Sequence, residues 1–93
     1  MKIALFPNEI KHRSLKVATE VCQFLKNKGV EVVAEDRLAA IIGAKDLVED
    51  DINQIDFRIS LGGDGTILRL VHRHPNLQAP LLGINLGSLG FLA

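Results

Sequence analysis

The sequence has no tryptophan or tyrosine, a single cysteine and no long apolar segment. Its longest unbroken apolar run, residues 38–42, is far shorter than the roughly 20 residues that a membrane-spanning helix needs. Cys22 has no second cysteine with which to form an intrachain disulfide, and no cysteine–histidine cluster suggests a zinc site. These absences predict a cytoplasmic protein with no membrane partner.

The composition and charge are typical of one globular domain. Of the 93 residues, 47% are hydrophobic and 24% are charged, and the formal net charge is zero. A chain of this length buries roughly 60–65% of its unfolded surface, which is enough for one core. Basic residues are in excess over residues 1–29 and acidic residues over 30–56, but neither group forms an unbroken run. No nucleic-acid partner is therefore expected.

The last part of the sequence carries no formal charge. Residues 74–93 contain no Asp, Glu, Lys or Arg, and they end in an apolar segment. An exposed apolar segment of this kind promotes aggregation unless another surface covers it. We therefore expect residues 1–93 to form a single domain that is the N-terminal part of a longer protein, or one that buries this end against a partner.

Apolar periodicity divides the chain into alternating strands and helices. Short apolar runs bounded by Pro, Gly or polar residues predict buried strands, and apolar residues repeating every three or four positions predict helices. The strands are expected at residues 2–6, 30–34, 57–61 and 81–84, and the helices at 14–28 and 66–73. Residues 36–56 are ambiguous, because 38–42 fit a short helix or a strand and 49–51 a turn or a helix start. Strand–helix–strand units predict an α/β fold with a parallel sheet flanked by helices, in three layers (α/β/α).

The common phosphate-binding and hydrolase motifs are missing. The first strand-to-helix turn, residues 6–9, has no glycine, which argues against a Rossmann-type dinucleotide site. The sequence contains neither GxxxxGK[ST] nor GxSxG, so it has no Walker-type loop and no nucleophile elbow. His72 and His74 have no metal or triad spacing, and a solvated helix end is the simpler interpretation of both.

A glycine-rich turn follows the third predicted strand. Its residues are Gly62, Gly63, Asp64, Gly65 and Thr66. They join a strand to a helix, which places them at the carboxyl edge of a parallel sheet, where α/β folds bind ligands. The glycines permit positive φ angles and close approach of a ligand, and the backbone amides at a helix start bind anions. The turn therefore predicts a site for the phosphates of a nucleotide.

Asp64 does not fit a simple phosphate site, because its carboxylate would repel the ligand. Three roles would resolve the conflict. Asp64 could cap a helix that begins at Gly65 or Thr66, coordinate a divalent cation that bridges phosphates, or accept a proton from a substrate hydroxyl. A cap alone does not require three glycines. Thr66 is likewise either a helix-start residue or a ligand contact.

Two motifs resemble those of the NAD kinase family. Residues 61–66, LGGDGT, resemble the GGDGT signature that NAD kinases share with diacylglycerol and sphingosine kinases. Residues 83–92, GINLGSLGFL, resemble the GxNxGxLGFL block of NAD kinases, whereas lipid kinases have a different block in that region. The resemblance implies the N-terminal α/β domain of a kinase that phosphorylates the 2′-hydroxyl of the adenosine ribose of NAD to give NADP.

The same resemblance implies roles for individual residues. Asp64 would lie against the ribose as the general base, Gly65 would line the same site, and Phe91 would pack near the adenine. The other implied ligand-binding residues are Gly62, Gly63, Thr66 and Asn85. Phe91 also fits a core position, and Asn85 also fits a bond to its own turn. The implied donor is ATP or polyphosphate with a divalent metal, expected to be Mg²⁺, and the implied assembly of the full-length enzyme is a homo-oligomer.

Two features depart from the family pattern. Arg58 lies within a strand that should be central, so either its side chain extends to solvent at the start of the strand or the strand lies nearer an edge. The chain also lacks the second, β-rich domain of NAD kinases, so residues 1–93 are expected to be inactive alone. A lipid kinase domain and a non-catalytic nucleotide-binding module stay open as alternatives.

Overall fold

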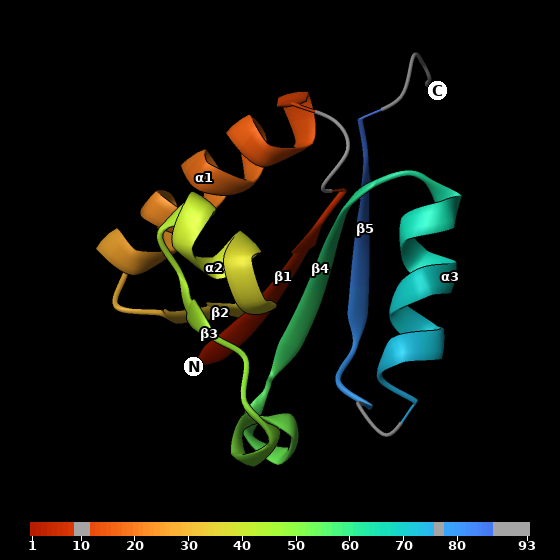
Figure 1. Cartoon of the computed structure of the whole chain (residues 1–93). Coiled ribbons are helices and arrows are strands. Elements are labelled where there is room, and N and C mark those ends of the chain that lie inside the picture. The colour runs from red at the N-terminus through yellow and green to blue at the C-terminus, as the bar shows by residue number, and fades with distance from the viewer. Residues whose placement is uncertain (9–11, 76–77, 87–93) are drawn as a thin grey trace.

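The chain alternates between strands and helices (Figure 1). The computed structural model describes residues 1–8, 12–75 and 78–86, and the side chains of 12, 36, 49–51, 64 and 65 lie outside the description. The helices are α1 (His12–Asn27), α2 (Asp36–Ile42) and α3 (Asp64–Arg73), with the 3-10 helix η1 (Glu49–Gln54). The strands are β1 (Lys2–Pro7), β2 (Glu31–Ala34), β3 (Lys45–Asp46), β4 (Phe57–Gly62) and β5 (Leu81–Asn85).

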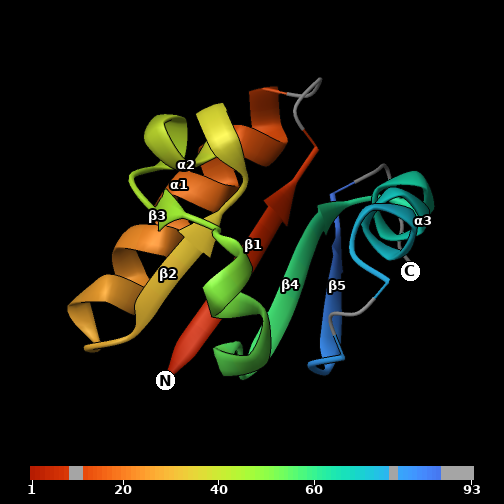
Figure 2. The ribbon, with the colours of Figure 1, turned by 60° about the horizontal axis from the view of Figure 1, so that its bottom comes forward.

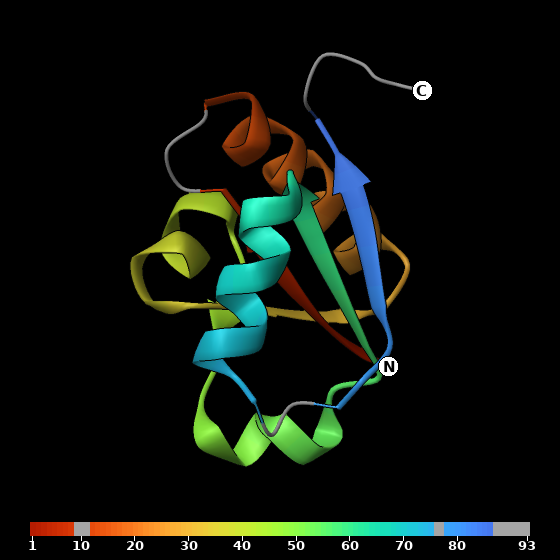
Figure 3. The same cartoon turned by 90° about the vertical axis from the view of Figure 1, so that its right-hand side faces the viewer.

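The strands form one parallel sheet in the order β3-β2-β1-β4-β5 (Figure 2). From β1 the chain moves through α1 to β2 on one side, and from β4 it moves through α3 to β5 on the other. Right-handed crossovers that run in opposite directions place their helices on opposite faces. Accordingly α1 and α2 pack on one face and α3 on the other, which confirms the predicted α/β/α layers (Figure 3).

Successive side chains of β1 point alternately into two core clusters, one on each face of the sheet. Ile3 and Leu5 belong to the cluster under α1 and α2, whereas Ala4 and Phe6 belong to the cluster under α3. This alternation follows from the two-residue period of a strand. All four side chains are buried, because a central strand of a parallel sheet is covered on both faces.

Helix α1 meets the sheet through small residues one turn apart. Ser14, Ala18 and Cys22 are all buried, and burial raises the pKa of the Cys22 thiol above its ordinary value. Gly29 follows the helix in the left-handed region at φ 83°, a conformation that favours glycine after a helix end. Among the helices of the described residues, none is long and apolar enough to cross a membrane.

The ambiguous residues 36–56 form three short elements. The helical alternative holds for residues 38–42, which lie in α2, and residues 49–51 lie in η1. Between them, β3 pairs in parallel with Val33 and Ala34 of β2. A strand of two residues is too short to show the two-residue period by which strands are recognised in a sequence. Its position depends instead on pairing with the neighbouring strand.

Arg58 is the second residue of an internal strand. Strand β4 is internal, between β1 and β5, but it lies nearer an edge of the sheet than the central strand β1, as the second alternative expected. Its side chain is half-buried at the start of β4, and its Nε–H donates a hydrogen bond to the carbonyl of Ala79 at 2.8 Å. Burial lowers the pKa of the guanidinium below its ordinary value.

His74 is not at a solvated helix end, in contrast to the prediction. Its side chain is 20% exposed, and its Nε2 lies 2.8 Å from Oε2 of Glu35, which follows β2. Its ring also lies 5.7 Å from the ring of Phe6. The prediction was wrong for His74 because α3 ends against β1 and the start of α2, whereas His72 is exposed as predicted.

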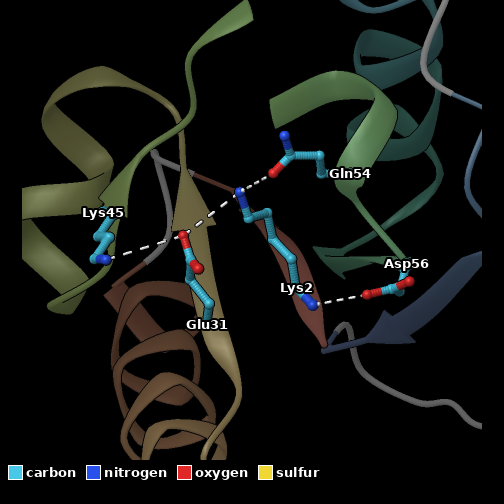
Figure 4. Close-up of polar contacts among 5 residues, drawn as sticks. All are labelled: Lys2, Glu31, Lys45, Gln54 and Asp56. Atoms are coloured by element: carbon cyan, nitrogen blue, oxygen red, sulfur yellow. Dashed lines mark hydrogen bonds and ion pairs between the residues drawn. The ribbon is translucent and has the colours of Figure 1, made fainter. Parts of the chain in front are cut away.

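Lys2 joins three elements at the amino edge of the sheet (Figure 4). Its Nζ lies 3.1 Å from Oε1 of Gln54 and 3.5 Å from Oε2 of Glu31, and its backbone N–H donates to Asp56 at 2.8 Å. The Lys2 side chain is only 12% exposed, so these partners offset its desolvation. This network positions η1 at the end of the sheet opposite the glycine-rich turn.

Candidate functional site at the carboxyl edge

The carboxyl edge between β1 and β4 is the topological switch point of the sheet. The chain leaves β1 toward β2 and leaves β4 toward β5, in opposite directions. Such a divergence opens a crevice in which α/β folds bind ligands. Strands β1, β4 and β5 end at Pro7, Gly62 and Asn85, all at the upper end of the sheet in Figure 1. The glycine-rich turn therefore begins at the edge where the sequence placed it.

The backbone carbonyls at the end of β4 all accept hydrogen bonds. The Leu61 carbonyl accepts two, at 2.9 Å from the Asn8 N–H just after β1 and at 2.8 Å from the Ser14 hydroxyl in α1. The Gly62 carbonyl accepts one from the Leu86 N–H at 3.0 Å, and the Gly63 carbonyl one from the Thr66 N–H at 3.1 Å. Because the first N–H groups of a helix have no carbonyl one turn earlier, this turn presents donors rather than acceptors, which favours an anion.

Gly62 occupies a position that no larger residue fits. Its φ is 155°, and a Cβ atom built on it would lie 2.5 Å from Thr66 Oγ1 and 3.1 Å from Asn8 Cβ. These distances are shorter than ordinary van der Waals contacts. The absence of a side chain at Gly62 therefore lets α3 and the end of β1 approach β4 closely.

Gly63, rather than Asp64, caps helix α3. Gly63 has φ −133° and ψ −165°, an extended conformation that any residue adopts, and α3 begins at Asp64. The alternative in which Asp64 caps a helix beginning at Gly65 or Thr66 is therefore wrong, because α3 begins one residue earlier and the Gly63 carbonyl closes its first turn with Thr66. As the first helical residue, an aspartate complements the helix dipole. Of its three predicted roles, metal binding and proton transfer stay predictions.

Thr66 lies beneath the turn. Its side chain is buried, and its Oγ1 has no hydrogen-bond partner among the described residues. A buried hydroxyl without a partner costs about 1–3 kcal/mol of desolvation. The Thr66 hydroxyl packs against Gly62. Thr66 therefore contributes to the shape of the turn, whether or not it contacts a ligand.

We expect Thr66→Val to keep or raise the stability of the full-length protein. Valine retains the shape of threonine and removes the orphaned hydroxyl, so the free energy of unfolding should stay within about 1 kcal/mol of wild type or increase. Denaturant unfolding measures this, with Thr19→Val as the control, because Thr19 is exposed and its hydroxyl donates to the Leu15 carbonyl. A loss of about 2 kcal/mol or more would show that the Thr66 hydroxyl has a partner in the folded protein.

A small cleft lies between the ends of β4 and β5 and helix α3. It has a volume of about 150 Å³ and is lined by Gly62, Gly63, Asn85 and four further residues, Ser60, Ile67, Gly83 and Ile84. Asn85 is exposed and pairs in register with Gly62 across the two strands. Sites for small molecules usually measure about 300–1,000 Å³, so this cleft has room for only part of a nucleotide.

Some of the predicted site residues lie outside the described structure. Phe91 is one of them, and so are the side chain of Asp64 and residues 87–92 of the second motif. The structure brings together Gly62, Gly63, Thr66 and Asn85, with Gly65 as the second residue of α3. Among the side chains that are described, no group of three or more His, Cys, Asp or Glu residues could hold a metal ion.

Asn8 and Ser14 belong to no sequence motif that predicts a place at this site. Both border the switch point, and Ser14 is fully buried with its hydroxyl bonded to Leu61. The available signal was the position of Ser14 at helical spacing from Ala18 and Cys22, on the apolar face of α1. A polar side chain on a buried face needs a partner, although the sequence does not say which.

Comparison with known proteins identifies similar sequences over almost the whole chain. A family model described as the ATP-NAD kinase N-terminal domain matches residues 3–93. The chain is 62% identical over 91 residues to the NAD kinase of Protochlamydia amoebophila, an alignment that covers 98% of this chain and 33% of that protein. It is 38% identical over 97 residues to the NAD kinase of Thermococcus kodakarensis, covering 99% of this chain and 34% of that protein.

A third relative combines two activities in its name. The chain is 34% identical over 93 residues to the bifunctional NADP phosphatase/NAD kinase of Methanocaldococcus jannaschii, covering 100% of this chain and 16% of that protein. The chain thus spans about a third of the length of the two NAD kinases above and 16% of the length of the bifunctional protein.

Proposed function

Because the chain belongs to the ATP-NAD kinase family, we propose that the full-length protein phosphorylates the 2′-hydroxyl of the adenosine ribose of NAD to give NADP, with ATP or polyphosphate as donor. The observation that carries the proposal is the match of the family model to residues 3–93, which includes the glycine-rich turn at the switch point. A ligand-binding edge and a sequence signature thus coincide in the same residues.

Asp64 is the proposed general base. Its carboxylate takes the proton of the ribose 2′-hydroxyl as that oxygen forms a bond to the terminal phosphorus of the donor. The bond from this phosphorus to the bridging oxygen breaks, and ADP or the shortened polyphosphate leaves. A positioned base contributes about 10²–10⁴-fold to such a rate, and the rest comes from orientation and charge. This role is compatible with Gly63, rather than Asp64, standing at the cap position of α3.

The turn from Gly62 to Gly65 is the proposed phosphate-facing part of the site. Its carbonyls at Gly62 and Gly63 are already bonded, so the N–H groups at the start of α3 remain to face an anion. Thr66 and Asn85 border the same site, and Phe91 is proposed to pack near the adenine. A divalent metal, proposed to be Mg²⁺, would neutralise phosphate charge. Asp64 is proposed as the carboxylate linked to this metal, because Mg²⁺ commonly binds one or two carboxylates plus substrate phosphates.

Residues 1–93 are proposed to carry one part of a two-domain active site and to be inactive alone. The 150 Å³ cleft is too small for a dinucleotide, and the relatives named NAD kinase are about three times longer. The remaining contacts to NAD are therefore proposed to come from outside these residues. The protein is proposed to act on NAD and ATP in the cytoplasm as a homo-oligomer, without nucleic-acid or membrane partners.

The proposal is tested by assaying the purified full-length protein with NAD, Mg²⁺ and either ATP or polyphosphate. We expect NADP to form, detected by a dehydrogenase that accepts only NADP. With 2′-deoxyadenosine NAD, which lacks the attacking hydroxyl, no phosphorylated product should form, and diacylglycerol should not act as an acceptor. Absence of NADP with both donors would overturn the proposed function, and phosphorylation of diacylglycerol would reassign the protein to the lipid kinases.

A further inference from the structure

The hydroxyl of Ser14 connects the two strands of the switch point. Ser14 is completely buried in α1, and its hydroxyl donates a hydrogen bond to the Leu61 carbonyl at 2.8 Å. The same oxygen accepts a hydrogen bond from the Asn8 N–H at 2.8 Å, and that N–H also lies 2.9 Å from the Leu61 carbonyl. One side chain thus joins α1, the end of β1 and the end of β4.

This network lies directly against the glycine-rich turn. Leu61 precedes Gly62 in the chain, and Asn8 Cβ would lie 3.1 Å from a Cβ atom built on Gly62. The hydroxyl therefore holds the backbone that precedes Gly62 in β4 and the neighbouring backbone at the end of β1, and from Gly62 the turn runs on to Asp64. If the Ser14 bonds were lost, α1 would no longer be tied to the ends of β1 and β4, whose direct Asn8–Leu61 hydrogen bond would remain, and the backbone before Gly62 could shift together with the start of α3.

Packing alone does not require a hydroxyl at this position. Ser14 continues the line of small buried residues formed by Ala18 and Cys22, and an alanine would fill the position without any polar group to satisfy. A buried hydroxyl is tolerated only when it is bonded, and this one acts as donor and acceptor at once. Its specific contribution is the hydrogen-bonded geometry at the switch point.

We propose that Ser14 is a positioning residue for phosphoryl transfer, which acts through Leu61 and Asn8 to hold the glycine-rich turn in its reactive place. This inference rests on the proposed function. It concerns kcat more than NAD affinity, because most contacts to NAD are proposed to lie outside this chain. A displacement of about 1 Å at reacting groups can cost about 10²-fold in rate.

The test compares Ser14→Ala with Thr19→Ala in the full-length protein. Thr19 is a matched control, since its hydroxyl lies on the same helix but is exposed and donates to the Leu15 carbonyl at 2.8 Å. We expect Ser14→Ala to lower kcat at least about tenfold and to change KM for NAD by less than about threefold. Thr19→Ala should leave both unchanged. Ser14→Cys, similar in size but a weak donor, should show the same direction of change.

Amide hydrogen exchange separates positioning from general destabilisation. We expect residues 62–66 to exchange faster in Ser14→Ala, while residues of β2 keep their wild-type protection. Wild-type kcat in Ser14→Ala, or equally increased exchange throughout the chain, would overturn the inference. If the wild-type protein forms no NADP, the proposed function fails by itself. The exchange result then still decides whether Ser14 positions the turn.

Discussion

Replacing Asp64 by asparagine should lower the kcat of the full-length protein for NAD about 10²–10⁴-fold, while NAD still binds. Asparagine has almost the same size but cannot take up the proton of the ribose hydroxyl. Its loss of negative charge at the first position of α3 should cost only about 0.3–1 kcal/mol of stability. The measurements are steady-state turnover and calorimetric titration of the variant with NAD.

Asp56→Asn is the matched control for this experiment. Asp56 lies at the opposite, amino edge of the sheet, where its carboxylate accepts the Lys2 N–H at 2.8 Å (Figure 4). An asparagine oxygen can accept the same bond, so this variant should turn over like wild type. If Asp64→Asn keeps its turnover within about threefold of wild type, Asp64 is not the proton acceptor.

Replacing Gly62 by alanine should destabilise the full-length protein by about 2–4 kcal/mol and abolish most NADP formation. The new Cβ would lie 2.5 Å from Thr66 Oγ1 and 3.1 Å from Asn8 Cβ, in a backbone conformation that side chains rarely adopt. Relief of these contacts requires movement of α3 or of the end of β1, and either displaces the turn. Denaturant unfolding and the NADP assay measure the two effects.

Two further variants separate the close contact from backbone strain. Gly29→Ala introduces a side chain at φ 83° with nothing within 4 Å, so it should cost only about 1 kcal/mol. The double variant Gly62→Ala with Thr66→Ala removes the 2.5 Å contact and should recover part of the lost stability. If Gly62→Ala costs no more than Gly29→Ala, the close packing around Gly62 is not a constraint on the turn.

The position of the glycine-rich turn was largely predictable from local sequence. An apolar run followed by Gly62, Gly63 and Asp64 and then by helical periodicity predicts a strand, a turn and a helix without knowledge of distant residues. One of the three roles considered for Asp64, that of the helix cap, failed for an equally local reason. The sequence offered Asp64 as the usual capping residue, but Gly63 takes that position once its carbonyl bonds to Thr66.

Other features depended on residues far apart in the chain. His74 pairs with Glu35 across 39 positions, and the two-residue strand β3 exists only because it pairs with β2. Neither the His74–Glu35 contact nor strand β3 has a repeating sequence pattern of its own. Each arises because the sheet order brings two distant elements together. Local periodicity therefore predicted the long elements and missed these contacts.

The sequence by itself determined the α/β alternation, the glycine-rich turn and the likeness to NAD kinases, because apolar periodicity and a contiguous motif are local properties. Only the tertiary structure decided that β1 and β4 are neighbours, that Gly62 is enclosed by Asn8 and Thr66, and that Ser14 bonds Leu61 across 47 positions. These contacts arise from sheet order and helix packing, in which the free energy of burying whole elements selects the partners.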